Sequence, residues 1–223
     1  MDAVIQRAGL ALTRVMHSAR AGRTELLLFL FFFVVFALTA GRTLDLSSDV
    51  WTTNYASWRL ATEHTPYLDG VPIPELDHNV LKSVWIQDAP NGHTVVTRAP
   101  AAVLAGLPAY LLTQPDRMTL LPAALTAAAL TAASVTLVHR AVRSAVGPAQ
   151  ALAAASAFGL ATPVWSVAAN GIWPHTITVL GIALVAWAAS SERWWWLGFA
   201  GVLLLWARPH APARRAAGPP RRR

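Results

Sequence analysis

The stretch LLLFLFFFVVFALTAG, residues 26–41, decides the fold class, because its sixteen residues carry no charge and little polarity. A helix needs about 20 mostly apolar residues to cross a bilayer, and this stretch reaches that length when counted from Thr24 to Leu44. A long basic leader precedes it, and Leu38 occupies a position where a signal-peptide cleavage site needs a small residue. We therefore expect 25–41 to be a retained membrane helix rather than a cleaved signal peptide.

The remainder of the chain repeats this pattern of apolar blocks with short polar breaks. Of its 223 residues, 55% are hydrophobic and 13% charged, whereas about 25% are charged in a typical soluble domain. Several later segments are expected to cross the membrane: 118–138, 148–168, Trp173–Ser190 and Trp194–Ala207. The predicted fold is an all-α integral membrane protein, a polytopic helical bundle with about five crossings.

The segment RAPAAVLAGLPAYLL, residues 98–112, is short for a crossing and contains Pro100 and Pro108. If it crossed fully, the basic HRAVR motif at 139–143 would lie opposite the basic N-terminus. If it is re-entrant or interfacial, the N-terminus, HRAVR and Ser191–Arg193 all fall on the cytoplasmic side, as the positive-inside rule favours. We prefer the second topology, in which residues 42–97 form one structured outer loop.

The charge distribution defines the remaining regions. Residues 42–97 hold seven of the eleven acids, so the net charge of +7 comes from elsewhere, and no nucleic-acid-binding motif accompanies it. Residues 1–24 form a basic cytoplasmic leader, either a helix on the membrane surface or a disordered segment. Residues 98–207 form the membrane bundle. The tail 208–223, built from Ala, Pro, Arg and Gly with one His, is either a polybasic tail or the product of a truncated or frameshifted gene.

Single side chains near the segment ends carry the candidate chemistry. Asp49 follows the first membrane helix closely, where a carboxylate is positioned to act as a general base, to bind a divalent cation, or only to cap the next helix. Arg98 and Arg208 stand at membrane boundaries, where arginine either pairs with a lipid phosphate or serves as a snorkelling anchor. His175 opens a membrane helix and is either structural or catalytic. His93, in a predicted turn at 88–96, is expected to be solvated.

Several short motifs resemble GT-C-type membrane glycosyltransferases, including the bacterial dolichyl-phosphate-mannose-like and aminoarabinose transferases. They are the Asp-x5-Tyr-Ala-x3-Leu pattern that begins at Asp49, a downstream Pro-Tyr, the R-x-P at Arg98, and GLATPVWSVAANGIWPH at 159–175. In that family an acid early in the first outer loop is catalytic or binds metal, and the matching position here is Asp49. A second acid often follows directly. Val50 stands there in this chain, which weakens the match or shifts the partner role to Asp45.

The resemblance implies transfer of a sugar from a polyprenyl-phosphate donor to an acceptor on the outer face of the cytoplasmic membrane. Asp49 would activate the acceptor or hold Mg²⁺ or Mn²⁺, and Arg98 or Arg208 would bind the donor phosphate. The implied partners are membrane lipid and the lipid-linked sugar, with no nucleic acid. The alternatives are a non-enzymatic membrane protein, such as an assembly factor or transporter fragment, and an inactive glycosyltransferase fragment. Phe31, Phe32 and Phe33 are expected to face lipid or neighbouring helices, so that Phe32→Ala costs little.

Overall fold

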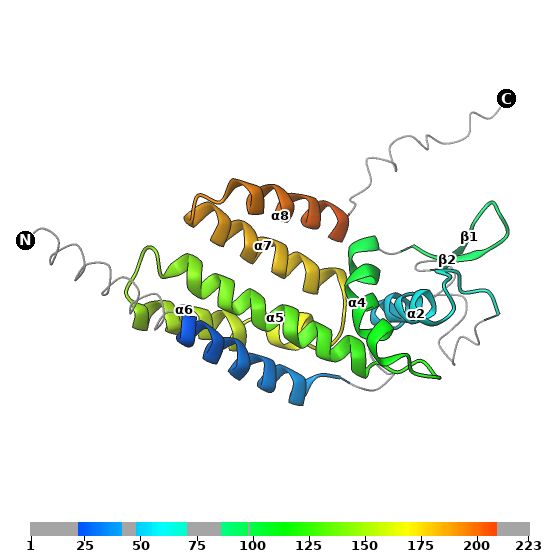
Figure 1. Cartoon of the computed structure of the whole chain (residues 1–223), viewed down its shortest axis with the longest axis horizontal. Helices are drawn as coiled ribbons and strands as arrows, with labels where there is room; N and C mark the ends of the chain where they lie inside the picture. The colour runs from blue at the N-terminus through cyan, green and yellow to red at the C-terminus, as the bar shows by residue number, and fades with distance from the viewer. Residues whose placement is uncertain (1–21, 42–47, 71–85, 98, 209–223) are drawn as a thin grey trace, which may run out of the picture.

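A computed structural model describes residues 22–41, 48–70, 86–97 and 99–208, and it is mostly helical. The basic leader up to residue 21, Asp45, Arg98 and the tail from 209 onward lie outside these described residues. Within them, five helices lie roughly along the long axis of the molecule (Figure 1): Gly22–Thr39, α5 (Leu121–Val142), α6 (Pro148–Leu160), α7 (Pro174–Ser190) and α8 (Trp194–Ala207).

The bundle is built on small residues and prolines. The buried face of α5 consists largely of alanines and threonine, which lets α7 approach it closely, and α7 also packs along α8. Proline stands in the first turn of α5, α6, α7 and a further helix, α4 (Pro100–Thr113), where its missing N–H would have no helical partner in any case. The predicted start of a helix at the Trp-Pro-His motif and the predicted bounds of Trp194–Ala207 are confirmed.

Two of the described helices, Gly22–Thr39 and α5, are long and apolar enough to cross a membrane, fewer than the five crossings expected. Helices α7 and α8 are apolar but have 17 and 14 residues. Residues 148–168 do not form one helix, because α6 ends at Leu160 and the chain resumes as a π-helical turn, η1 (Val164–Ala168). Pro163 has no N–H to continue the ladder, and the Thr162 side chain donates to the Phe158 carbonyl at 2.6 Å.

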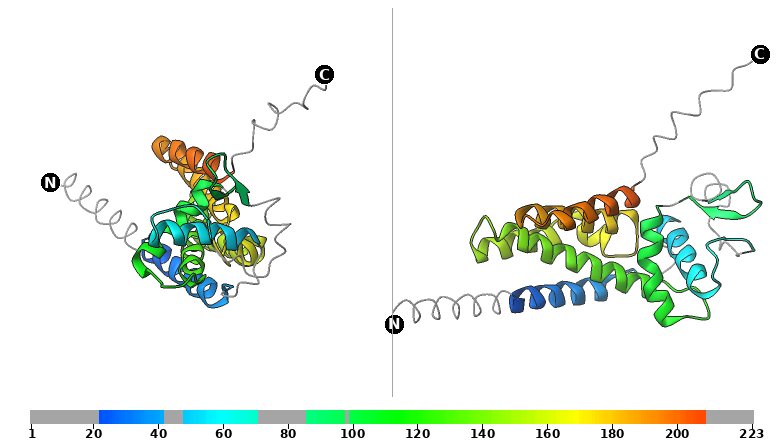
Figure 2. Two further views of the ribbon diagram at one scale, coloured as in Figure 1. Left: turned by 90° about the vertical axis from the view of Figure 1, so that its right-hand side faces the viewer. Right: turned by 45° about the horizontal axis from the view of Figure 1, so that its top comes forward.

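Two helices lie across one end of the bundle rather than along it (Figure 2): α2 (Ser48–Thr62) and α4 (Pro100–Thr113). They are joined by Ser57, whose Oγ donates to the Val103 carbonyl at 2.8 Å. Gly106 permits this close approach, since a Cβ there would lie 2.9 Å from Ser57 Oγ. Helix α4 is thus fixed across the end of the bundle, at an angle to α5 (Figure 2).

Residues 86–96 form a hairpin, which confirms the turn predicted for 88–96. Strands β1 (Ile86–Asp88) and β2 (Thr94–Val96) pair antiparallel with Gln87 opposite Val95. Gly92 has φ +83°, a left-handed conformation that suits glycine in such a turn. The hairpin is tied to the end of the α2 region by the Leu68 N–H, which donates to the Thr94 carbonyl at 2.8 Å.

The three phenylalanines of the first helix differ in their surroundings. Phe32 is fully buried and packs so closely on α6 that a Cβ at Gly159 would lie 2.5 Å from Phe32 Cε1. Phe31, one position earlier, is 55% exposed. Phe32 thus faces a neighbouring helix, as expected, and because its ring fills the interface with α6 the structure predicts a larger cost for Phe32→Ala than the sequence did.

Candidate functional site

The first turn of α2, which contains Asp49, packs against the turn between η1 and α7. Val50 is fully buried, and a Cβ on Gly171 would lie 2.9 Å from its Cγ1, so only glycine allows this approach without a shift. The Asp49 side chain lies outside the described atoms, but its backbone immediately precedes Val50. The start of α2 and the ANGIWPH motif, separated by more than a hundred residues, are thus neighbours.

The η1–α7 turn is held by two threonines. Thr176 Oγ1 donates to the Ala168 carbonyl at 2.8 Å or the Gly171 carbonyl at 3.0 Å, and it accepts from the Trp173 N–H at 3.3 Å. Thr131, from α5, reaches the same Ala168 carbonyl at 3.1 Å. Because both hydroxyls are buried, the turn is fixed to the bundle core and presents Trp173 and His175 in a defined position.

Four buried polar atoms of α2 and one beside Gly171 have no hydrogen-bond partner in the described part of the chain: Trp51 Nε1, Thr53 Oγ1, Asn54 Oδ1, Arg59 Nε and Trp173 Nε1. Asn54 uses its amide nitrogen to donate to the Val50 carbonyl at 2.6 Å, which leaves the oxygen unpaired. A buried polar atom without a partner costs about 1–3 kcal/mol. Such a concentration is typical of a site where water or a ligand supplies the missing bonds.

Trp51 lies in the first turn of α2 and is buried. It is 1% exposed, and its ring lies 4.4 Å from the Tyr55 ring. Burial raises the pKa of the Tyr55 phenol, with Arg59 opposing that effect. The aromatic row continues to Trp58, whose Nε1 donates to the Pro115 carbonyl at 2.9 Å.

Arg208 and His175 meet at the same end of the molecule. Arg208 Nη2 lies 2.5 Å from His175 Nδ1, and the Trp173 ring lies 5.6 Å from the imidazole. Guanidinium has donors only, so Nδ1 accepts and the ring in this contact is neutral. A neutral partner orients the guanidinium but leaves its positive charge in place.

Sequence reasoning therefore identified some members of this cluster and missed others. The structure brings His175 and Arg208 into contact. Asp49 lies one residue before Val50, which packs against the turn that leads to His175. Asn54 and the buried indole nitrogens were not singled out. A signal was present, because the consecutive Thr52, Thr53 and Asn54 are poor helix formers in the middle of a helix, and all three are fully buried.

His93 also departs from expectation, since it is paired rather than merely solvated. Its Nδ1 lies 2.5 Å from Asp69 Oδ2, and its ring stacks on Tyr67 at 4.1 Å. Asp69 Oδ1 also accepts from the Thr94 N–H at 2.6 Å. The backbone bond from Thr94, and then the bond from His93, hold the pKa of Asp69 below its usual value. These contacts anchor the hairpin to the segment that follows α2.

No protein-family model, curated protein or solved structure matches this chain.

Proposed function

We propose that the chain is a polytopic membrane protein that transfers a sugar from a polyprenyl-phosphate donor to an acceptor outside the cytoplasmic membrane. The observation that carries this proposal is the convergence of three separate segments at one end of the bundle. They are the first turn of α2 with Asp49, the 168–173 turn with its unpaired Trp173 Nε1, and Arg208 at the end of α8.

The exposed apolar surface supports a membrane location. On the Gly22–Thr39 helix, Leu27 is 57% exposed and Leu38 is 74% exposed, while on α8 Leu205 is 67% exposed and Trp195 is 93% exposed. Water would oppose exposure of so much apolar surface, whereas lipid tails accept it. The short α7 and α8 would then cross together with their flanking residues or through a locally thinned bilayer.

Three arginines at one end of the bundle support an orientation in which the Asp49 end faces outward. Arg140 and Arg143 at the end of α5, and Arg193 between α7 and α8, line one cavity together with the start of the first helix. They lie at the opposite end of the long helices from the α2 contact (Figure 1). By the positive-inside rule the arginine end is cytoplasmic, so the Asp49 end faces outward.

The chemistry requires a base and a cation that stabilises the leaving group. The acceptor hydroxyl oxygen attacks the anomeric carbon of the sugar while the bond from that carbon to the phosphate oxygen breaks. Asp49 takes the hydroxyl proton, and polyprenyl phosphate leaves with the electron pair. Arg208, oriented by neutral His175, stabilises the charge that develops on that phosphate. The orphan indole and amide groups beside Val50 would bind the sugar hydroxyls.

A divalent cation at this site would depend on Asp49 and on the donor phosphate. The described residues contain no cluster of three or more His, Cys, Asp or Glu side chains. Mg²⁺ is often held by one or two carboxylates together with substrate phosphates, so this donor set fits such an ion. When bound, the cation would supply charge stabilisation at the phosphate. The proton transfer to Asp49 does not depend on it.

The test is transfer from a radiolabelled polyprenyl-phosphate sugar in membranes of cells that express the full chain. We expect loss of the labelled donor and appearance of a labelled acceptor well above the level in membranes without the chain. Equal transfer in the two preparations would contradict the enzymatic proposal and favour a non-enzymatic role for the same bundle.

A further inference from the structure

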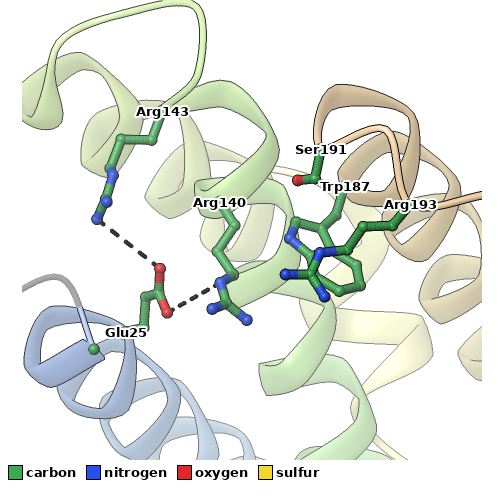
Figure 3. Close-up of a pocket in the computed structure, with 7 residues that line it drawn as sticks. Glu25, Arg140, Arg143, Trp187, Ser191 and Arg193 are labelled. Carbon is green, nitrogen blue, oxygen red and sulfur yellow. Dashed lines mark ion pairs between the residues drawn. The ribbon is translucent and has the colours of Figure 1, made fainter. Parts of the chain in front are cut away.

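The cavity at the arginine end has a chemistry that the sugar-transfer site does not use. It has a volume of ≈ 470 Å³ and is lined by residues from three segments (Figure 3): Gly22, Glu25, Arg140, Arg143, Trp187, Ser191 and Arg193. Three of these side chains are guanidinium groups and one is a carboxylate. The cavity is therefore net positive, and it is large enough to admit a phosphate-containing headgroup.

Glu25 organises two of the arginines without neutralising the cavity. Its carboxylate lies 3.0 Å from Arg140 Nε and 3.9 Å from Arg143 Nη1, and the side chain is 14% exposed. Arg140 and Arg143 remain 45% and 37% exposed. Their terminal nitrogens can thus reach a ligand in the cavity while Glu25 fixes the side-chain direction.

Trp187 positions the guanidinium groups at the rim. The Arg140 guanidinium carbon lies 5.6 Å from the Trp187 ring centroid, and that of Arg193 lies 5.3 Å away. Contacts of this length are favourable cation–π interactions. Within the described residues Arg193 has no ion-pair partner, and in Figure 3 its head group lies against the Trp187 ring. The Trp187 ring thus contacts two guanidinium groups, and these contacts offset part of the repulsion between the two charges.

We propose that this cavity binds the phosphate of an anionic phospholipid headgroup. Arginine forks match phosphate oxygens in pairs, and the Ser191 hydroxyl adds a neutral donor. The site lies at the end of α5, a helix of membrane-spanning length, at the level expected for headgroups. The cytoplasmic leaflet is rich in anionic lipid, and the proposed orientation places this end there. The inference depends on the membrane location but not on sugar transfer.

The experiment uses the full chain purified in a neutral detergent. Native mass spectrometry measures how many phosphatidylglycerol molecules, and how many phosphatidylcholine molecules of similar mass, stay bound. Thermal unfolding with each lipid, and with inorganic phosphate alone, gives a second readout. We expect selective retention of phosphatidylglycerol and a higher unfolding temperature with it, and little effect of phosphatidylcholine or inorganic phosphate.

Arg143→Gln and Arg193→Gln should each weaken phosphatidylglycerol binding about tenfold, as loss of one charge-assisted hydrogen bond predicts. The matched control is Arg117→Gln, which removes an exposed arginine from the α4–α5 connection and should change nothing. Glu25→Gln removes the carboxylate that competes with phosphate, and should tighten binding. Because this variant predicts a gain, it tests the proposal even if an arginine variant fails to fold.

Three results would overturn the proposal. Equal retention of the two lipids would mean that the cavity does not select anionic headgroups. An equal loss with Arg117→Gln would mean that net charge alone drives the association. Stabilisation by inorganic phosphate as large as that by phosphatidylglycerol would mean that the ligand is a soluble anion. None of these outcomes bears on sugar transfer, which is measured at the other end of the molecule.

Discussion

Arg208, the residue that directly follows α8, lies with its Nη2 2.5 Å from Nδ1 of His175 in the first turn of α7. The contact holds two ends of a helical hairpin together at the level of Trp173 and the start of α2. It also leaves the guanidinium charge without a counter-charge from this partner, because Nδ1 of His175 is a neutral acceptor. A charge directed in this way suits a role at a phosphate leaving group more than a role in stability.

Arg208→Gln is therefore expected to lower kcat about 10²-fold or more, the effect typical of losing a donor that stabilises transition-state charge. His175→Leu should lower kcat less, because the arginine charge survives, and His175→Gln should recover most of that loss by supplying an acceptor oxygen. Transfer assays in membranes with matched protein levels measure this. Arg117→Gln is the charge-matched control, and if it were as damaging as Arg208→Gln the assignment would fail.

The proposed orientation predicts which residues are accessible from outside the cell. The chain has no cysteine, so single-cysteine variants can be labelled without background. Asn91→Cys at the hairpin tip should react with an impermeant maleimide on intact cells, and Ser144→Cys after α5 should react only after permeabilisation. Both side chains are exposed, so accessibility is matched. Labelling of position 144 on intact cells would contradict the topology.

The buried ring of Phe32 predicts a clear difference between neighbouring residues of one helix. Phe32→Ala should destabilise the fold by about 3–5 kcal/mol, the range for removing a buried aromatic ring. Phe31→Ala, on the exposed face, should cost under about 1 kcal/mol. Unfolding in detergent compares the two variants. Similar stability of both would show that the first helix does not pack on α6 as described.

These phenylalanines show which feature of the first helix the sequence does not predict. All sixteen residues of 26–41 are apolar or small, so the stretch indicates a helix apolar enough to cross a membrane but not which face of that helix meets protein. The face is set by Gly159, far along the chain, whose missing Cβ makes room for Phe32. By contrast, the start of α7 and both ends of α8 were predictable, because Pro174 and the polar Ser191–Arg193 break the apolar pattern locally.

The site shows the same division. Asp49, His175 and Arg208 stand out as isolated polar residues at the edges of apolar segments, so the sequence indicates them. How these residues lie relative to one another depends on contacts between distant segments, such as the packing of Val50 against Gly171, which sequence spacing does not predict. The break between α6 and η1 was also missed, because 148–168 carries no charged residue and the effect of Pro163 depends on the Thr162 side-chain bond.

The hairpin anchor predicts a specific pH dependence. Folding lowers the pKa of Asp69 below its ordinary 3.8, chiefly through the Thr94 N–H and then through His93. The anchoring contribution is therefore present above about pH 4 and is lost as the pH falls through the folded pKa. The hydrogen-exchange protection factor of the Thr94 amide should drop over that acidic range. In Asp69→Asn, which keeps an acceptor oxygen but does not titrate, protection should stay constant.

A drop of the same size in Asp69→Asn would mean that another group controls the hairpin.

The most direct test of the central proposal is the transfer rate of Asp49→Asn with a radiolabelled polyprenyl-phosphate sugar. Asparagine keeps the size of the side chain and caps a helix nearly as well as aspartate, but it cannot take a proton. We predict a loss of about 10²–10⁴-fold in rate at unchanged protein level, with little effect of Asp116→Asn. Asp45→Asn should cost much less than Asp49→Asn, unless Asp45 supplies the second acid of the site. Near-normal transfer by Asp49→Asn would show that the residue is only a helix cap and would contradict the proposed site.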